Sequence, residues 1–161
     1  MASHEERILI LCKTYPSPSA MHGETSCIAG MRQDGTLIRL FPVPFRLIND
    51  ESQFRKWQWI TARVEKAKKD HRAESQKVFV DTIQCDAKPL STDDYWRDRR
   101  VWLDKIEVFD DFSAIQKAKD ERGITLAVLK PSRILSLSIL NQLLSKIGQM
   151  GKEPSCFKCS S

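Results

Sequence analysis

The amino-acid sequence predicts an α+β protein, mainly β, whose centre is a partly open five-stranded barrel. Short apolar runs with strand-like alternation recur along residues 8–83. Asp34-Gly35 separates two of these runs, as a hairpin turn does. The composition changes after residue 86, where helical patterns replace strands. Two helices and an incomplete second β module are therefore expected to follow the barrel.

The barrel strands lie in the N-terminal half of the sequence. Ile8–Cys12 is short, apolar and closely bounded, which is typical of a buried strand. The segment Lys13–Ser19 contains two prolines and is predicted to be a loop. Asp34-Gly35 favours a type I′ turn, which needs positive φ at both central residues. Strands are expected at residues 8–14, 25–31, 36–41, 57–64 and 77–83, with a short helical insert in 45–54.

A helical connector is predicted next. The first helix begins at Ser91 or Thr92, with Asp94 in a capping-box position, and continues to about Ile106. Its apolar stripe consists of Tyr95, Trp96, Trp102, Leu103 and Ile106. The second helix, Ser113–Glu121, is expected to be capped by Ser113 with Gln116 and ended by Gly123. The predicted division is a barrel over 1–86, a connector over 87–123 and a partial second OB-like module with a frayed tail over 124–161.

Charge and cysteine content limit the class of protein. The net charge of +5 comes from residues 39–77, which contain ten lysines and arginines and five acidic residues. Such a surplus attracts phosphates, although a solvated face also explains it. The five cysteines are odd in number and scattered, which favours a reducing, cytoplasmic setting. The polar N-terminus has no signal-peptide pattern, and no apolar run approaches membrane-spanning length.

Aromatic and basic residues alternate on two predicted strands. Arg39 and Phe41 share one strand face, while Trp57, Trp59 and Arg63 share another. Rings beside cations suit base stacking and phosphate contact. The alternatives are that Arg39 only covers Phe41 and that the tryptophans belong to the core. The predicted ligand-binding residues are Lys13, Thr14, Arg39, Phe41, Trp57, Trp59, Arg63 and Arg72.

Three segments resemble a known family. CKTYPSPS, ETSCIAG and LIRLFPVPFRL are similar to the dual OB-containing family of uncharacterised bacterial proteins, and the similarity covers most of residues 7–135. The resemblance implies two OB-like barrels joined by helices and a role in binding nucleic acid or a nucleotide. It implies that the loop holding Lys13 and Thr14 flanks the ligand face. Beyond Leu135 the family carries a fuller second module, so the resemblance implies a truncated or divergent member.

No catalytic or metal-binding set is evident. His22 with Glu24 lacks the further ligands that a metal needs, and Cys156-x-x-Cys159 is only half of a zinc knuckle. The acids near the helix ends suit capping. We therefore expect no enzyme activity and no cofactor. The sequence favours a binding module for single-stranded nucleic acid or a nucleotide; a protein-interaction or self-associating module using the helices is the alternative, and a metal-dependent nuclease comes third.

Overall fold

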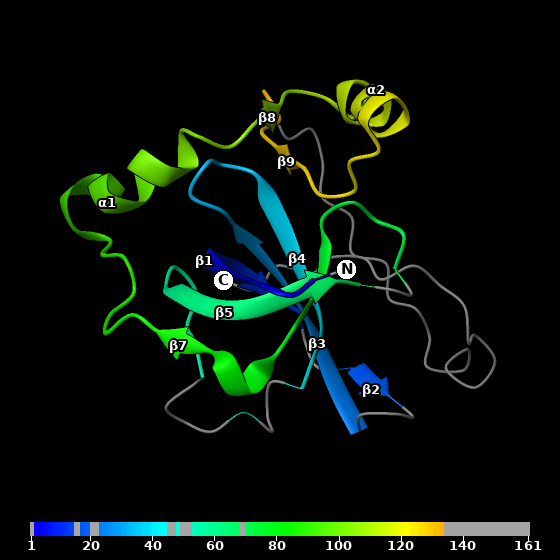
Figure 1. Cartoon of the computed structure of the whole chain (residues 1–161). Helices are drawn as coiled ribbons and strands as arrows, with labels where there is room; N and C mark the ends of the chain where they lie inside the picture. Colours follow the sequence, from blue (N-terminus) through cyan, green and yellow to red (C-terminus); the bar gives the residue numbers. More distant parts are fainter. Residues whose placement is uncertain are drawn as a thin grey trace, which may run out of the picture.

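The computed structural model describes residues 2–14, 17–19, 23–44, 48, 53–67 and 70–133 of the chain. Its centre is a five-stranded barrel (Figure 1). The strand order around the barrel is β1-β3-β4-β6-β5, and β5 pairs again with β1. This last pairing closes the barrel that the sequence predicted to be partly open. The barrel strands are β1 (His4–Lys13), β3 (Gly23–Met31), β4 (Leu37–Val43), β5 (Trp59–Lys66) and β6 (Ser75–Val78).

The strand order is that of a Greek-key, OB-like barrel. Counted within the barrel alone, the strands follow the order 1-2-3-5-4 and return to 1. The β4–β6 pair is parallel, with Arg39 opposite Ser75, and the other barrel pairs are antiparallel. Two short strands extend the sheet: β2 (Ser17–Ser19) pairs with β3, and β7 (Gln84–Cys85) pairs with β5. The predicted α+β class, mainly β, is confirmed.

Apolar side chains form two separate clusters, one inside the barrel and one outside it. Ile8 and Ile10 of β1 point into the barrel, whereas Leu9, between them, belongs to the outer cluster. The apolar run that begins at Ile8 is continuous because both faces of this strand are covered. The outer cluster consists of Leu9, Met31, Trp59 and Ile106, with Trp102 and Leu103 among the half-buried residues packed against it.

The segment after the barrel covers this outer cluster. It contains α1 (Asp93–Leu103), β8 (Val108–Phe109), α2 (Phe112–Arg122) and β9 (Val128–Leu129). In Figure 1 these elements lie on one side of the barrel, opposite β2 and β7. The only part of the predicted second β module found in the described residues is β9, which pairs in parallel with β8. Residues 134–161 lie outside the described part of the chain.

Several predicted boundaries are corrected by the structure. Ser17–Ser19, predicted as loop, forms β2 at the sheet edge, where the proline at position 18 is tolerated. The strand predicted to end at Phe41 continues to Val43 through Pro42, since β3 still pairs with it there. The predicted strand 77–83 is instead β6, a 3₁₀ turn over Val80–Thr82, and β7.

Turn and cap chemistry was only partly predicted. The hairpin at Asp34-Gly35 is confirmed, but only Gly35 has positive φ (91°), so its turn is not type I′. The amide of Gly35 donates to the carbonyl of Arg32, and the loop ends at Thr36, as in a three-residue hairpin with a bulge glycine. The α2 cap is Asp111, whose side chain accepts from the amide of Ala114, and not Ser113 as predicted. Gly123 ends this helix at φ 69°, as predicted.

Candidate functional site

The eight residues predicted to bind a ligand lie in separate places. Arg39, Phe41 and Arg72 gather at a buried polar network, whereas Trp59 lies under α1 and Arg63 lies elsewhere on the outer wall of β5. The predicted residues therefore do not share one open face. Trp57 is half-buried against the outer cluster, and its ring also contacts the partly exposed Trp96.

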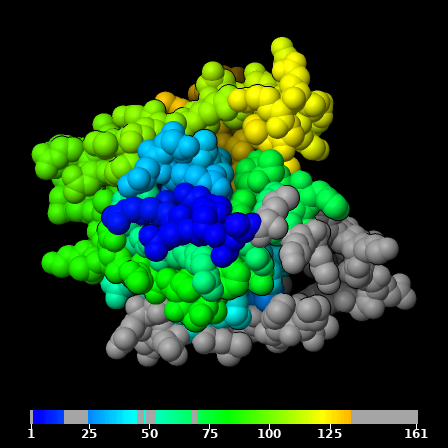
Figure 2. All heavy atoms as spheres, viewed as in Figure 1, coloured from blue at the N-terminus to red at the C-terminus, as the bar shows by residue number. Residues whose placement is uncertain are grey.

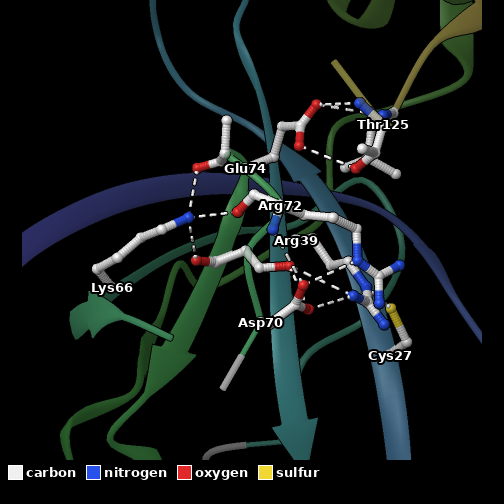
Figure 3. A network of polar contacts seen from close by, with 10 residues as sticks. Cys27, Arg39, Lys66, Asp70, Arg72, Glu74 and Thr125 are labelled. Carbon is white, nitrogen blue, oxygen red and sulfur yellow. Dashed lines mark hydrogen bonds and ion pairs between the residues drawn. The ribbon is translucent and has the colours of Figure 1, made fainter. Parts of the chain in front are cut away.

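Arg39 is buried, and its guanidinium group contacts other side chains of the protein. Its side chain is 7% exposed, and its Nη1 atom lies 2.6 Å from Oδ2 of Asp70. The same nitrogen donates to Oγ of Ser75, and Nε donates to Sγ of Cys27 at 2.9 Å. The guanidinium carbon also lies 5.0 Å from the centre of the Phe41 ring. Figure 3 shows Arg39, Asp70 and Cys27 gathered at this network.

Asp70 accepts hydrogen bonds on both carboxylate oxygens. Oδ2 accepts from Arg39 and from Oγ of Ser75 at 2.7 Å, while Oδ1 accepts from the backbone N and Nε of Arg72 at 3.2 and 2.9 Å. Burial alone would raise the pKa of Asp70. The hydrogen bonds from Arg72 and Ser75 outweigh burial and lower the pKa to about 2. Asp70 is therefore a carboxylate at neutral pH and balances the buried Arg39.

Trp59 is part of the core, which is the alternative to ligand binding that the sequence allowed for the tryptophans. It is 5% exposed, and the Trp102 ring of α1 packs edge-on against it with centroids 4.7 Å apart. Its strand alternation was read correctly, because Ile60, Ala62 and Val64 point into the barrel. The outward ring is buried because α1 covers it, which strand periodicity cannot reveal.

The remaining predicted residues contact nearby strands and loops. The Thr14 hydroxyl accepts from the amide of Cys27, which links the end of β1 to β3. The Nζ atom of Lys13 donates to the carbonyl of Phe54 at 3.2 Å. Burial, followed by repulsion from Lys56, lowers the pKa of Lys13. Arg63 is exposed, and its guanidinium carbon lies 4.6 Å from the centre of the Phe79 ring.

The best candidate site is a group that we call the tryptophan–arginine cluster: Trp57, Trp96 and Arg99, which are in contact, and the exposed Tyr95, which precedes Trp96 in the chain. The Trp57 and Trp96 rings meet edge to face at 6.0 Å. The guanidinium carbon of Arg99 lies 4.8 Å from the Trp57 centroid and 5.1 Å from the Trp96 centroid. Arg99 Nε donates to the carbonyl of Leu90 at 3.0 Å. Among the described residues, no carboxylate forms an ion pair with Arg99.

The backbone at the start of α1 exposes the aromatic rings. Asp94, Tyr95 and Trp96 have φ of 50°, 53° and 66°, so this turn is left-handed and only the later part of α1 is regular helix. The predicted apolar stripe is therefore interrupted: Tyr95 is 87% and Trp96 is 45% exposed, whereas Trp102, Leu103 and Ile106 pack on the barrel. In Figure 2 the segment containing α1 forms the left flank of the molecule.

Sequence reasoning found Trp57 but missed Tyr95, Trp96 and Arg99 as surface groups. A helical period assigned the two rings to the buried stripe, because a left-handed turn of non-glycine residues costs roughly 1–2 kcal/mol per residue and is not expected. The interleaving of aromatic residues and arginines in Tyr95-Trp96-Arg97-Asp98-Arg99 was the available signal. It resembles the aromatic-plus-basic pattern noted on the strands.

In the part of the chain that the structure describes, no cluster of three or more His, Cys, Asp or Glu side chains is arranged to hold a metal ion. Within the same ranges, no helix has both the length and the apolar character needed to cross a membrane. His22 and Cys156-x-x-Cys159 lie outside those ranges.

Fold and surface together define an OB-like β-barrel domain with an exposed aromatic and basic cluster on an appended helix. The chain belongs to the family described as Domain of unknown function (DUF8758), whose model matches residues 4–105. The match begins with β1 and ends two residues after α1, so it includes the barrel and the helix that covers its outer cluster. No curated protein and no solved structure matches the chain. The family match does not confirm the resemblance to the dual OB-containing family.

Proposed function

We propose that this domain binds single-stranded nucleic acid or a nucleotide, and that the tryptophan–arginine cluster makes the contact. The observation that carries the proposal is Arg99, which lies between two tryptophan rings with no carboxylate partner in the described residues. Because this cation already covers the rings, the cluster disfavours cationic ligands. A flat, anionic ligand matches both the rings and the charge, and a nucleotide has both features.

Neighbouring features support the same ligand class. Tyr95 and Trp96 offer exposed ring surface, and stacking of a base on such a ring contributes about 1–3 kcal/mol. Lys56, which precedes Trp57 in the sequence, is exposed and adds positive charge to this part of the chain. OB-like barrels commonly bind oligonucleotides, which is a fold-level analogy. The cysteine content favours a cytoplasmic setting for such a protein.

The test is a titration of the intact chain with a mixed-sequence single-stranded oligonucleotide, followed by tryptophan fluorescence at low and physiological salt. We expect quenching that weakens as salt rises. Arg99→Gln should weaken binding about tenfold, and Trp96→Ala should weaken it by about tenfold or more.

Arg97→Gln is the matched control, since it removes the same charge from the same helix. Arg97 is exposed and pairs with Asp94 at 2.7 Å. If Arg97→Gln and Arg99→Gln lose the same amount of oligonucleotide affinity, Arg99 contributes only general electrostatic attraction and not a specific contact. Absence of binding at low salt by the folded chain would reject the proposal.

A protein-binding role is the second candidate, and one observation favours it. Phe112, at the start of α2, is 77% exposed, and Val108 of β8 is 44% exposed. Contiguous exposed apolar surface is a feature of protein contacts, and these two side chains are candidates for such a patch. Sedimentation of the wild type and of Phe112→Ser tests self-association through α2: a concentration-dependent dimer lost in the variant supports it.

A further inference from the structure

The Asp70 carboxylate lies among more positive charge than it carries. Arg39 and Arg72 both form ion pairs with it, at 2.6 and 2.9 Å. Lys66 reaches the same loop, where its Nζ donates to the carbonyls of Arg72, Ala73 and Ser75. Figure 3 shows these three cationic side chains converging on the loop from different sides.

Glu74, the other acidic residue described in this loop, already accepts hydrogen bonds from another segment of the chain. The carboxylate of Glu74 accepts from the amide and hydroxyl of Thr125 at 2.5 and 2.9 Å and from the amide of Leu126 at 3.2 Å. Burial alone would raise the pKa of Glu74, but these hydrogen bonds lower it. Glu74 therefore holds the segment before β9 and leaves Asp70 to balance two guanidinium groups, those of Arg39 and Arg72.

The position of the network matches the ligand face of this kind of barrel. Arg39 lies on β4, the third strand of the barrel, and Cys27 lies on β3, the second. OB-like barrels bind ligands on the face of these two strands and on flanking loops, including the one between the fourth and fifth strands. Asp70 belongs to that loop, between β5 and β6, and Phe41 places a ring beside Arg39.

We propose that Arg39 and Arg72 form a phosphate-binding site, and that the Asp70 carboxylate occupies this site in the structure. Guanidinium groups bind carboxylates and phosphates with the same geometry, so one anion can replace the other. A phosphate dianion matches the charge of the two guanidinium groups better than a single carboxylate does. The ligand is a phosphate group, free or within a phosphodiester chain, and its entry requires displacement of Asp70.

The experiment uses Asp70→Asn, which keeps the side-chain shape and removes the charge. Thermal unfolding is followed in sodium pyrophosphate and in sodium chloride of equal ionic strength. We expect pyrophosphate to bind the variant about tenfold or more tightly than the wild type, seen as a larger rise in Tm. Asp81→Asn is the matched control because Asp81 is exposed and lies outside the network; its response should equal that of the wild type.

A second variant assigns the effect to the proposed cations. Arg72→Gln in the Asp70→Asn background should remove most of the gain, and it is tolerable for folding because the Arg72 side chain is 45% exposed. If Asp70→Asn does not fold in chloride, recovery of folding in pyrophosphate alone supports the site. If the Asp70→Asn variant folds in neither salt, hydrogen exchange in the wild type tests whether pyrophosphate displaces Asp70. Pyrophosphate should then accelerate exchange of the Arg72 amide, which donates to Asp70, and unchanged exchange overturns the proposal.

An oligonucleotide without bases separates the two sources of phosphate. If it binds Asp70→Asn as pyrophosphate does, the site accepts backbone phosphodiesters; if only pyrophosphate binds, the site prefers a free phosphate. Equal pyrophosphate effects on Asp70→Asn, Asp81→Asn and the wild type overturn the proposal. The result is independent of the tryptophan–arginine cluster, because neither probe contains a base that stacks on its rings.

Discussion

Arg39 and Arg99 show two ways in which this domain holds a guanidinium. Arg39 is buried and faces the carboxylate of Asp70, so its charge is balanced within the protein. Arg99 lies against two tryptophan rings and a backbone carbonyl, and burial lowers its pKa from the ordinary value. The comparison shows that a cation on an aromatic surface keeps its charge available for a ligand, whereas a cation paired with a carboxylate stabilises the fold and can bind another anion only when that carboxylate is displaced.

The largest difference is expected in stability. Arg39→Gln should lower the free energy of unfolding by about 3–5 kcal/mol, because it leaves Asp70 without its buried partner. Arg99→Gln should cost less than about 1 kcal/mol, since only cation–ring contacts and one hydrogen bond are lost. Urea unfolding of both variants measures the two values. Similar costs would mean that the two arginines serve the fold alike.

The attachment of α1 provides the next test. Trp102→Ala should lower the free energy of unfolding by about 3 kcal/mol, because it uncovers Trp59 in the outer cluster. The same variant should expose Trp59 to water and shift its fluorescence to longer wavelength. A shift without a loss of stability would show that the barrel does not depend on its helical cover.

Acid should weaken the Arg39 region selectively. The pKa of Asp70 is about 2 when folded and 3.8 ordinarily, so its contribution is complete above about pH 4 and is lost as the pH falls toward 2. A shift of this size corresponds to about 2 kcal/mol for a side chain that is 16% exposed. The wild type should therefore exceed Asp70→Asn in stability at pH 5 by more than at pH 2. Comparing the two chains cancels the lowered pKa values of Asp34 and Glu74, which both chains share.

The smallest stability effect is expected at the exposed rings. Tyr95→Ala should change the free energy of unfolding by no more than about 0.5 kcal/mol, because the side chain is 87% exposed. If the proposed function holds, the same variant should weaken oligonucleotide binding several-fold. Urea unfolding and the fluorescence titration give both values. A large loss of stability would assign Tyr95 to the fold.

Much of the barrel could be predicted because its signals are local. The apolar run starting at Ile8, the alternation from Ile60 to Val64 and the turn glycine at position 35 each follow from neighbours in the chain. The same local reasoning failed at the start of α1, where a left-handed turn exposes Tyr95, and at Ser17–Ser19, where pairing with β3 overrides a proline.

The candidate sites were harder to predict because their partners are distant in sequence. Arg39 was correctly placed beside Phe41 on one strand, yet its main partner, Asp70, lies 31 residues away. Trp57 was singled out as an aromatic surface group, but Trp96 and Arg99 reach it from α1. No pattern within a strand or helix contains such pairings.

The sequence by itself determined the first four barrel strands, the hairpin, the end of α2 and the local excess of basic residues, because backbone preference and side-chain period act over a few residues. Only the tertiary structure decided which cations are balanced and which rings are covered. The parallel pairing of β4 with β6 places Asp70 against Arg39, and the docking of α1 buries Trp59 while leaving Trp96 partly exposed. The physical reason is that burial and charge pairing depend on distances between segments, which local preferences do not specify.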